Sequence, residues 1–176
     1  MSDQKTMYAD IIEEGLLPLV IPISSIKPDP RNARKHPERN LEAIKRSLAT
    51  YRQRKPIVVR KDTMTVEAGN GMLQAAKALG WPVIAAVVVN DDEDYAKGFG
   101  IMDNQSALTA EWDLPNLKDL LQELDTGAFD MDLTGFDTKE LEDLMTTGTI
   151  PGENKPINED AMQNTQNECP KCGFKW

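Results

Sequence analysis

A glycine turn between a strand and a helix constrains this chain more than any other segment. Residues 66–68 end a short apolar run, residues 69–71 read Gly-Asn-Gly, and residues 72–79 place apolar side chains at helical spacing before Gly80. We expect the Asn70 side chain to cap the helix and Gly80 to end it. The sequence therefore predicts a strand–turn–helix unit in which free backbone N–H groups point out of a glycine turn.

This turn is a candidate phosphate site, made by Gly69, Asn70 and Gly71. The N-terminus of a helix attracts anions, and glycine lets a ligand approach the backbone closely. The alternative is that the junction binds nothing, as many such junctions do. The turn lacks both the Lys-Ser/Thr pair of a P-loop and the third glycine of a dinucleotide fingerprint. Glu67 is a candidate catalytic residue that could reach a metal ion or a water, or an ordinary strand residue that faces solvent.

Charge is divided unevenly along the chain. Residues 27–61 hold twelve Lys/Arg and three Asp/Glu, whereas the rest of the chain holds eight Lys/Arg and 26 Asp/Glu. This asymmetry favours a basic face for a polyanion such as DNA. The alternative is that the basic residues are solvated, or paired with the acidic part. The candidate DNA contacts are Lys35, Lys45, Arg46, Arg52, Arg54 and Lys55.

Apolar spacing predicts an α/β (α+β) protein with a small mixed sheet, packed helices, a following helical segment and a flexible tail. The expected strands are 19–23, 56–60, 64–68 and 83–89, the last a buried strand because its apolar run is unbroken. Residues 1–17 are expected to form a short amphipathic helix or to be loose. The other expected helices are 38–51, 72–79, about 91–103 with a continuation to 110, 114–124 capped by Asp113, and one to Met145 opened by a capping box at 137–140.

These elements suggest five regions. They are an N-terminal extension (1–18), a mixed α/β domain (19–89), a helical extension that packs on it (90–146), a linker (147–168) and a Cys-x-x-Cys tail (169–176). Cys169 and Cys172 have the spacing of half a zinc ribbon. Since His36 is the one further donor of the usual kind, we expect Zn²⁺ to be shared between two chains, supplied with ligands by a partner, or not bound at all.

The compartment is inferred from what the sequence lacks. No apolar run is long enough to cross a membrane, and the N-terminus has no pattern of an export signal. We therefore expect a cytoplasmic protein, in the host cytoplasm if it is encoded by a phage, with no membrane partner.

Several blocks in order resemble the ParB/sulfiredoxin superfamily, and specifically the ParB N-terminal domain of phages and mobile elements. The blocks lie at 26–34, 41–48, 53–59 and 67–76, with a further one at 102–112. The resemblance implies a small mixed α/β fold that binds CTP or ATP with Mg²⁺. It implies that Gly69, Asn70 and Gly71 contact the phosphates together with Arg31, Asn32 and Arg34, and that Gln53 lies near the nucleotide.

The chain also departs from that family. The turn reads Gly69-Asn70-Gly71-Met72 where ParB has Gly-Glu-Arg-Arg, and Asn70 stands where sulfiredoxin has its reactive cysteine. We therefore expect no sulfiredoxin-type reductase activity. We also predict that no helix-turn-helix domain follows, and hence no recognition of a specific centromere-like DNA site.

Three hypotheses about function follow. The first is a ParB-like, DNA-associated and nucleotide-binding accessory protein in DNA modification or maintenance, with DNA, a DNA methyltransferase or another phage protein, and a second copy of the chain as candidate partners. The second is a nucleotide hydrolase or nuclease that acts at the Gly69 turn, so the sequence leaves enzymatic activity open. The third is a non-enzymatic interaction module with a zinc-ribbon-like tail.

Overall fold

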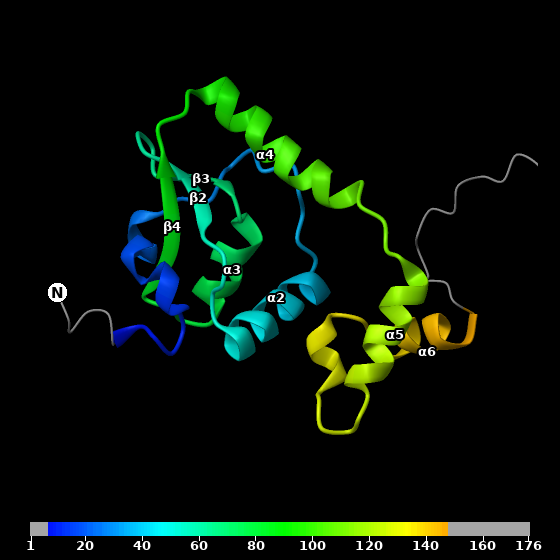
Figure 1. Ribbon diagram of the computed structural model, residues 1–176. Coiled ribbons are helices and arrows are strands. Elements are labelled where there is room, and N and C mark those ends of the chain that lie inside the picture. Colours follow the sequence, from blue (N-terminus) through cyan, green and yellow to red (C-terminus); the bar gives the residue numbers. More distant parts are fainter. Residues whose placement is uncertain (1–6, 148–176) are drawn as a thin grey trace, which may run out of the picture. The chain divides into compact units, whose positions relative to one another are not determined.

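A computed structural model describes residues 7–147, which form two compact units (Figure 1). The first unit contains residues 7–112 and Leu133–Gly135, and the second contains Asp113–Asp132 and residues 136–147. The predicted tail with Cys169 and Cys172 lies outside the described residues. The predicted fold class is confirmed: a small mixed sheet is packed against helices.

The sheet of the first unit has four strands in the order β1-β4-β2-β3. Their bounds are Val20–Pro22 for β1, Ile57–Arg60 for β2, Thr65–Ala68 for β3 and Val83–Val89 for β4. Strands β2 and β4 are parallel, while β1–β4 and β2–β3 are antiparallel. Pro22 lies on an edge strand, where its missing N–H costs no ladder bond.

The main core lies between one face of the sheet and two helices, α2 (Glu38–Tyr51) and α3 (Asn70–Ala78). Leu48 of α2 and Leu73 of α3 are buried against Ile57, Val66 and Ile84 of the strands. The predicted bounds of α2 are confirmed. Strand β4 is buried at residues 83–86, as predicted, but Val87 and Val88 near its end are 37% and 42% exposed.

The glycine turn joins β3 to α3 as predicted, but its cap is different. Gly69 is the N-cap, with φ 97°, and Asn70 is already the first helical residue. A side chain at Gly69 would also meet Ile57 of β2, since an added Cβ would lie 2.5 Å from Ile57 Cγ2. At the other end, Gly80 has φ 71° and its N–H donates to Lys77. Gly80 therefore ends the helix in a Schellman motif, as the sequence predicted.

The N-terminal segment was predicted to be a short amphipathic helix or loose, and its described part is mainly turns and a 3-10 helix, Glu14–Leu19. Ile12 is fully buried, and the backbone around it bonds to both backbone groups of Gln53: Gln53 N–H donates to Ile11 and Glu13 N–H donates to Gln53. The segment is thus joined to the first unit by backbone hydrogen bonds.

Helix α4 (Glu93–Leu108) contacts β3, the edge strand of the sheet, and runs above β3 and α3 in the view of Figure 1. Asp92 caps it by accepting from the N–H groups of Asp94 and Tyr95. The helix continues through Gly98 and Gly100, which sequence propensity marks as weak points. Gly100 is required by packing, because an added Cβ would lie 2.9 Å from the carbonyl oxygen of Glu67.

The second unit contains α5 (Leu114–Leu124) and α6 (Thr138–Thr147). Leu117, Leu121 and Leu144 are buried between them. Asp113 caps α5, and Asp137 and Glu140 form the predicted capping box at α6, with each side chain accepting from the other residue's N–H. The caps and apolar spacing of both helices are therefore as the sequence predicted.

Candidate functional site

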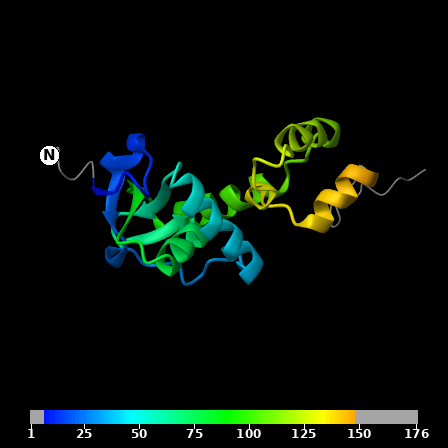
Figure 2. The same ribbon diagram turned by 90° about the horizontal axis from the view of Figure 1, so that it is seen from below.

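The proline-rich loop before α2 is held in place by backbone and side-chain hydrogen bonds. Lys27 bonds along the free edge of β3, to Met64 and Val66. Farther along, Asp29 N–H donates to Asn70 Oδ1 at 2.9 Å, which links the loop to the first turn of α3. Figure 2 shows this loop (blue) running beside α3 to reach α2 (cyan). The site residues of the loop are thereby fixed against the glycine turn.

A pocket of about 450 Å³ opens between this loop, β3 and α4. The loop contributes Arg31, Asn32 and Arg34, three of the residues predicted to bind nucleotide. Strand β3 contributes Glu67, and α4 contributes Asn104 among other residues. The structure therefore brings the loop residues and Glu67 to one pocket, a size that suits a small-molecule ligand.

Glu67 is the one acidic side chain buried in this pocket. It is 9% exposed, and neither of its oxygens accepts a hydrogen bond from an N–H or hydroxyl group of the described residues, while the carboxyl group of Asp91 lies within hydrogen-bond reach. Burial raises the pKa of the Glu67 carboxyl group, and the negative charge of Asp91 raises it further, while Arg60 opposes them. An unpaired buried carboxylate destabilises the fold unless something donates to it.

The basic side chains of the pocket differ in how their charge is balanced. Arg31 pairs with Glu93, which also contacts Lys97. The hydrogen bond from Lys97 and the contact with Arg31 lower the pKa of Glu93 to about 2. Arg34 instead donates to the neutral amide oxygen of Asn104 at 3.2 Å. Its positive charge meets no carboxylate in the described part of the chain.

The glycine turn itself does not line the pocket. The amide oxygen of Asn70 is used by Asp29, and the imidazole ring of His36 packs on Gly71, where an added Cβ would lie 2.6 Å from its Cε1 atom. The first turn of α3 is therefore in contact with the chain's own loop. The predicted phosphate contacts of Gly69, Asn70 and Gly71 remain predictions.

The placement of Gln53 argues against a direct nucleotide contact. Its side chain is fully buried, and its amide bonds both backbone groups of Ala85: Oε1 accepts from Ala85 N–H at 2.7 Å, and Nε2 donates to Ala85 O at 2.8 Å. A second bond runs from Nε2 to Lys55 O. The Gln53 side chain therefore makes the hydrogen bonds to β4 that a strand backbone would otherwise make, just before β2 begins.

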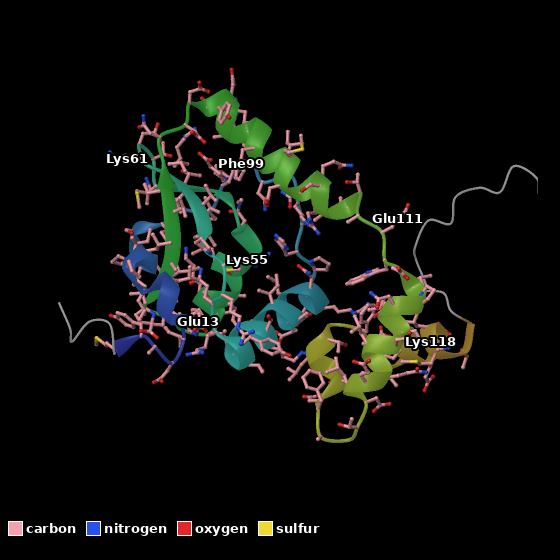
Figure 3. All side chains as sticks on the ribbon, viewed as in Figure 1. Glu13, Lys55, Lys61, Phe99, Glu111 and Lys118 are labelled. Carbon is pink, nitrogen blue, oxygen red and sulfur yellow. The ribbon has the colours of Figure 1, made fainter. Side chains whose placement is uncertain are left out.

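Only three of the six residues predicted to contact DNA lie together in the structure. Arg52, Arg54 and Lys55 line a second pocket, of about 370 Å³, with Ser47 and Tyr51 at the end of α2. Figure 3 labels Lys55 at this place. Arg52 is paired with Glu13 at 2.9 Å, whereas Arg54 lies over the Tyr51 ring. The other three candidates are Lys45, paired with Glu42, and Arg46 and Lys35, both exposed.

Two expected absences can be described for residues 7–147 only. Within them, no three His, Cys, Asp or Glu residues are grouped so that they could hold a metal ion. None of the helices in this range has the length and hydrophobicity that crossing a bilayer requires.

The fold is similar to that of ParB N-terminal domains. The chain matches the C-terminally truncated chromosome-partitioning protein ParB from Caulobacter crescentus in complex with CTP-γ-S, with a TM-score of 0.59, 20% identity, and coverage of 72% of this chain and 75% of that chain. This likeness establishes the fold. The first unit has a ParB-like fold, as the sequence blocks implied.

Two other solved structures match with lower TM-scores. The Caulobacter crescentus ParB complexed to the centromeric parS site gives 0.42 at 19% identity, covering 76% of this chain and 73% of that chain. Sulfiredoxin from Arabidopsis thaliana gives 0.39 at 16% identity, covering 47% of this chain and 97% of that chain. Among curated proteins, none matches the chain.

A second comparison concerns the C-terminal part. Residues 115–171 match the family described as the ParB-methyltransferase HTH domain. The expectation that no helix-turn-helix domain follows the α/β domain was therefore wrong. Helices α5 and α6 lie in the described part of the matched region. The match continues over residues that the sequence suggested were a linker and part of a tail. The turn between these helices is long and contains a short 3-10 helix, Met131–Thr134, which weakened the sequence pattern.

Sequence reasoning missed three residues of the site. His36 was considered as a further metal donor, but its ring packs on Gly71. Asn104 holds Arg34, and Gly100 allows α4 to approach β3. The signal for Gly100 and Asn104 was present as an i, i+4 pair of small or polar residues on a helix with weak amphipathic character, continuing the spacing of Ala96.

Proposed function

We propose that the protein is a ParB-like accessory protein that binds a nucleoside triphosphate, as its magnesium complex, and associates with DNA. The fold and the pocket support nucleotide binding, since the structurally similar ParB holds CTP-γ-S. The description of the matched C-terminal family supports a link to DNA methylation, so we place the protein in DNA modification or maintenance.

The charge of Arg34 carries the nucleotide part of this proposal. Its guanidinium lies in the pocket and is held by the neutral Asn104 amide, so its charge is available to a phosphate. Arginine binds phosphate oxygens through two parallel N–H groups, and such charge-assisted bonds are about twice as strong as neutral ones. Arg31 can join it when a phosphate competes with Glu93, because both arginines come from the same loop.

The experiment is calorimetric titration with CTP, ATP, GTP and UTP, each with Mg²⁺, for the wild type and for Arg34→Ala. We expect at least one nucleotide to bind the wild type, and Arg34→Ala to weaken that binding about 10- to 100-fold, as expected for one charge-assisted contact. The matched control is Arg54→Ala, which removes an exposed arginine outside the pocket and should leave the affinity unchanged.

Two results would contradict the proposal. One is the lack of binding of every nucleotide to the wild type. The other is an equal loss of affinity in Arg34→Ala and Arg54→Ala, which would indicate a general charge effect rather than a site in the pocket.

We assign the DNA contacts to the basic segment 27–61 rather than to the part that matches the HTH family. Residues 113–147 contain ten Asp/Glu and two Lys, so this region repels phosphates. Arg54 and Lys55 are exposed beside Tyr51 at the end of α2, a combination of basic and aromatic groups that suits a nucleic-acid backbone.

A further inference from the structure

The apolar stripe of α5 is wider than the surface that α6 covers. Leu117 and Leu121 pack with Leu144 of α6 and are 7% and 3% exposed, whereas Leu120 and Leu124 are 50% and 38% exposed. With 3.6 residues per turn, the exposed pair lies only about a sixth of a turn from the buried pair. Leu120 and Leu124 therefore extend the apolar stripe sideways, onto a surface that α6 leaves open.

The side of α5 next to the exposed leucines carries acids and no bases. Asp119 and Glu123 are exposed and lie one turn apart. Lys118 is the one base of this helix, and it lies on the other side, where its Nζ donates to the carbonyl oxygen of Met145 at 2.7 Å (Figure 3). Lys118 therefore does not balance the two acids beside the leucines.

The C-terminal end of α5 adds to this negative charge. The carbonyl groups at a helix C-terminus carry a partial negative charge, which basic side chains normally balance. The last turn of α5 contains no base, and Glu123 and Asp125 lie at this end instead. A cation bound there would relieve the repulsion between these acids and the helix carbonyls.

We infer that this face of α5 binds a basic amphipathic helix of a partner protein. Apolar side chains of that helix pack on Leu120 and Leu124, and its lysines or arginines pair with Asp119 and Glu123. DNA does not suit the face, because the acids repel its phosphates. The inference goes beyond the proposed function, since it involves neither the pocket at the loop nor the basic segment 27–61.

Other segments of this chain complement the face less well. Residues 148–168 contain four acids and one base, so their charge has the same sign as that of the face. The basic helix α2 of a second copy has its apolar side buried in the main core, so it offers charges without free apolar anchors. Residues 169–176 contain two lysines and two aromatic residues, and the experiment distinguishes them from a partner.

The test is fluorescence anisotropy of a labelled leucine–lysine peptide, with leucines spaced for one face of a helix, titrated with the full chain. The control peptide has the same composition with its leucines spread around the helix. We expect the amphipathic peptide to bind at least about 10-fold more tightly than the control peptide, because only it presents charge and apolar anchors together.

Variants locate the peptide on the face. The double substitution Leu120→Gln, Leu124→Gln should weaken binding about 10-fold or more, and so should Glu123→Lys. The matched controls are Met102→Gln on α4 and Glu142→Lys on α6, which change exposed residues elsewhere and should keep the affinity within about threefold. Cooperative thermal unfolding of each variant, measured in parallel, shows that a weaker affinity does not arise from a lost fold.

Four results would overturn the inference. The full chain binds neither peptide, or binds both equally, or loses affinity equally in the test and control variants. The fourth is that another occupant already covers the face. A peptide that binds only after Phe174→Ser, Trp176→Ser would assign the face to residues 169–176. Self-association in sedimentation velocity that Leu120→Gln, Leu124→Gln abolishes would assign it to a second copy.

Discussion

At the scale of single residues, the buried side chains that hold the fold together are polar as well as apolar. The side-chain amide of Gln53 bonds the backbone N–H and C=O of Ala85. Strand β2 begins only at Ile57, and Pro56, the residue before it, has no backbone N–H to donate to β4. The Gln53 amide therefore satisfies two buried backbone groups that the sheet itself leaves open. The Ala85 groups would otherwise lose their hydrogen bonds to water without a replacement.

Gln53→Leu should destabilise the protein strongly. Both Ala85 groups would be left buried and unpaired, at about 1–3 kcal/mol each, so we expect a loss of about 2–5 kcal/mol in the free energy of unfolding. Urea denaturation measures it. The control is Gln74→Leu on the exposed face of α3, which should change stability by no more than about 0.5 kcal/mol. An equally small effect at Gln53 would contradict its role in the sheet.

The residues of the loop were predicted from the family resemblance, and their contacts with the rest of the chain were not. Arg31, Asn32 and Arg34 were predicted and do line the pocket. Asn70 was predicted as a cap, but its amide is instead used by Asp29, which lies 41 residues earlier in the chain. A single sequence does not indicate which distant acceptor bonds the N–H of Asp29, because several side chains could accept that hydrogen bond equally well.

At the scale of elements, α4 shows where sequence pattern is least informative. Its inner face carries Ala96, Gly100 and Asn104, whereas Tyr95 and Phe99 are 70% and 39% exposed. Figure 3 shows Phe99 on this helix. This is the reverse of an ordinary amphipathic helix. The helices α2, α5 and α6 follow the usual pattern, and their spans or caps were predicted closely from spacing alone.

The two central glycines of α4 should respond oppositely to alanine. The Cβ that Gly98→Ala adds has no neighbouring atom within 4 Å. The substitution should therefore stabilise the protein by about 0.5–1 kcal/mol, because alanine has the higher helix propensity. Gly100→Ala places a Cβ against the Glu67 carbonyl oxygen, so the helix must shift and we expect a net loss of about 1–3 kcal/mol. Urea denaturation of the two variants measures both changes, and stabilisation by Gly100→Ala would show that α4 does not contact β3 closely.

At the scale of the whole molecule, the charge of the chain is divided between regions with different roles. The basic segment 27–61 supplies the loop, α2 and β2, while the region from 113 to 147 is strongly acidic. This division was visible in the composition alone. Which basic residues remain available was not, because Arg31, Lys45 and Arg52 turned out to be paired with acids.

DNA binding should depend steeply on salt and on exposed residues at the end of α2. Lys55→Ala removes one phosphate contact, so the slope of log K against log salt concentration should fall in magnitude by about 0.9. Fluorescence anisotropy with a duplex measures the slope between low and moderate salt. Lys77→Ala on α3 removes another exposed lysine and should leave the slope unchanged. Binding that does not vary with salt would exclude this surface as a DNA contact.

The strand order has a consequence for how the protein is synthesised. Among the described residues, β1 pairs only with β4, and β2 lies on the other side of β4, so the strand that joins them is the last of the four to be translated. A nascent chain that stops in α3 holds a β2–β3 hairpin and an unpaired β1, with two apolar edges open to other chains. Ribosomes that stall within residues 70–82 should therefore release the most aggregation-prone fragments of this protein.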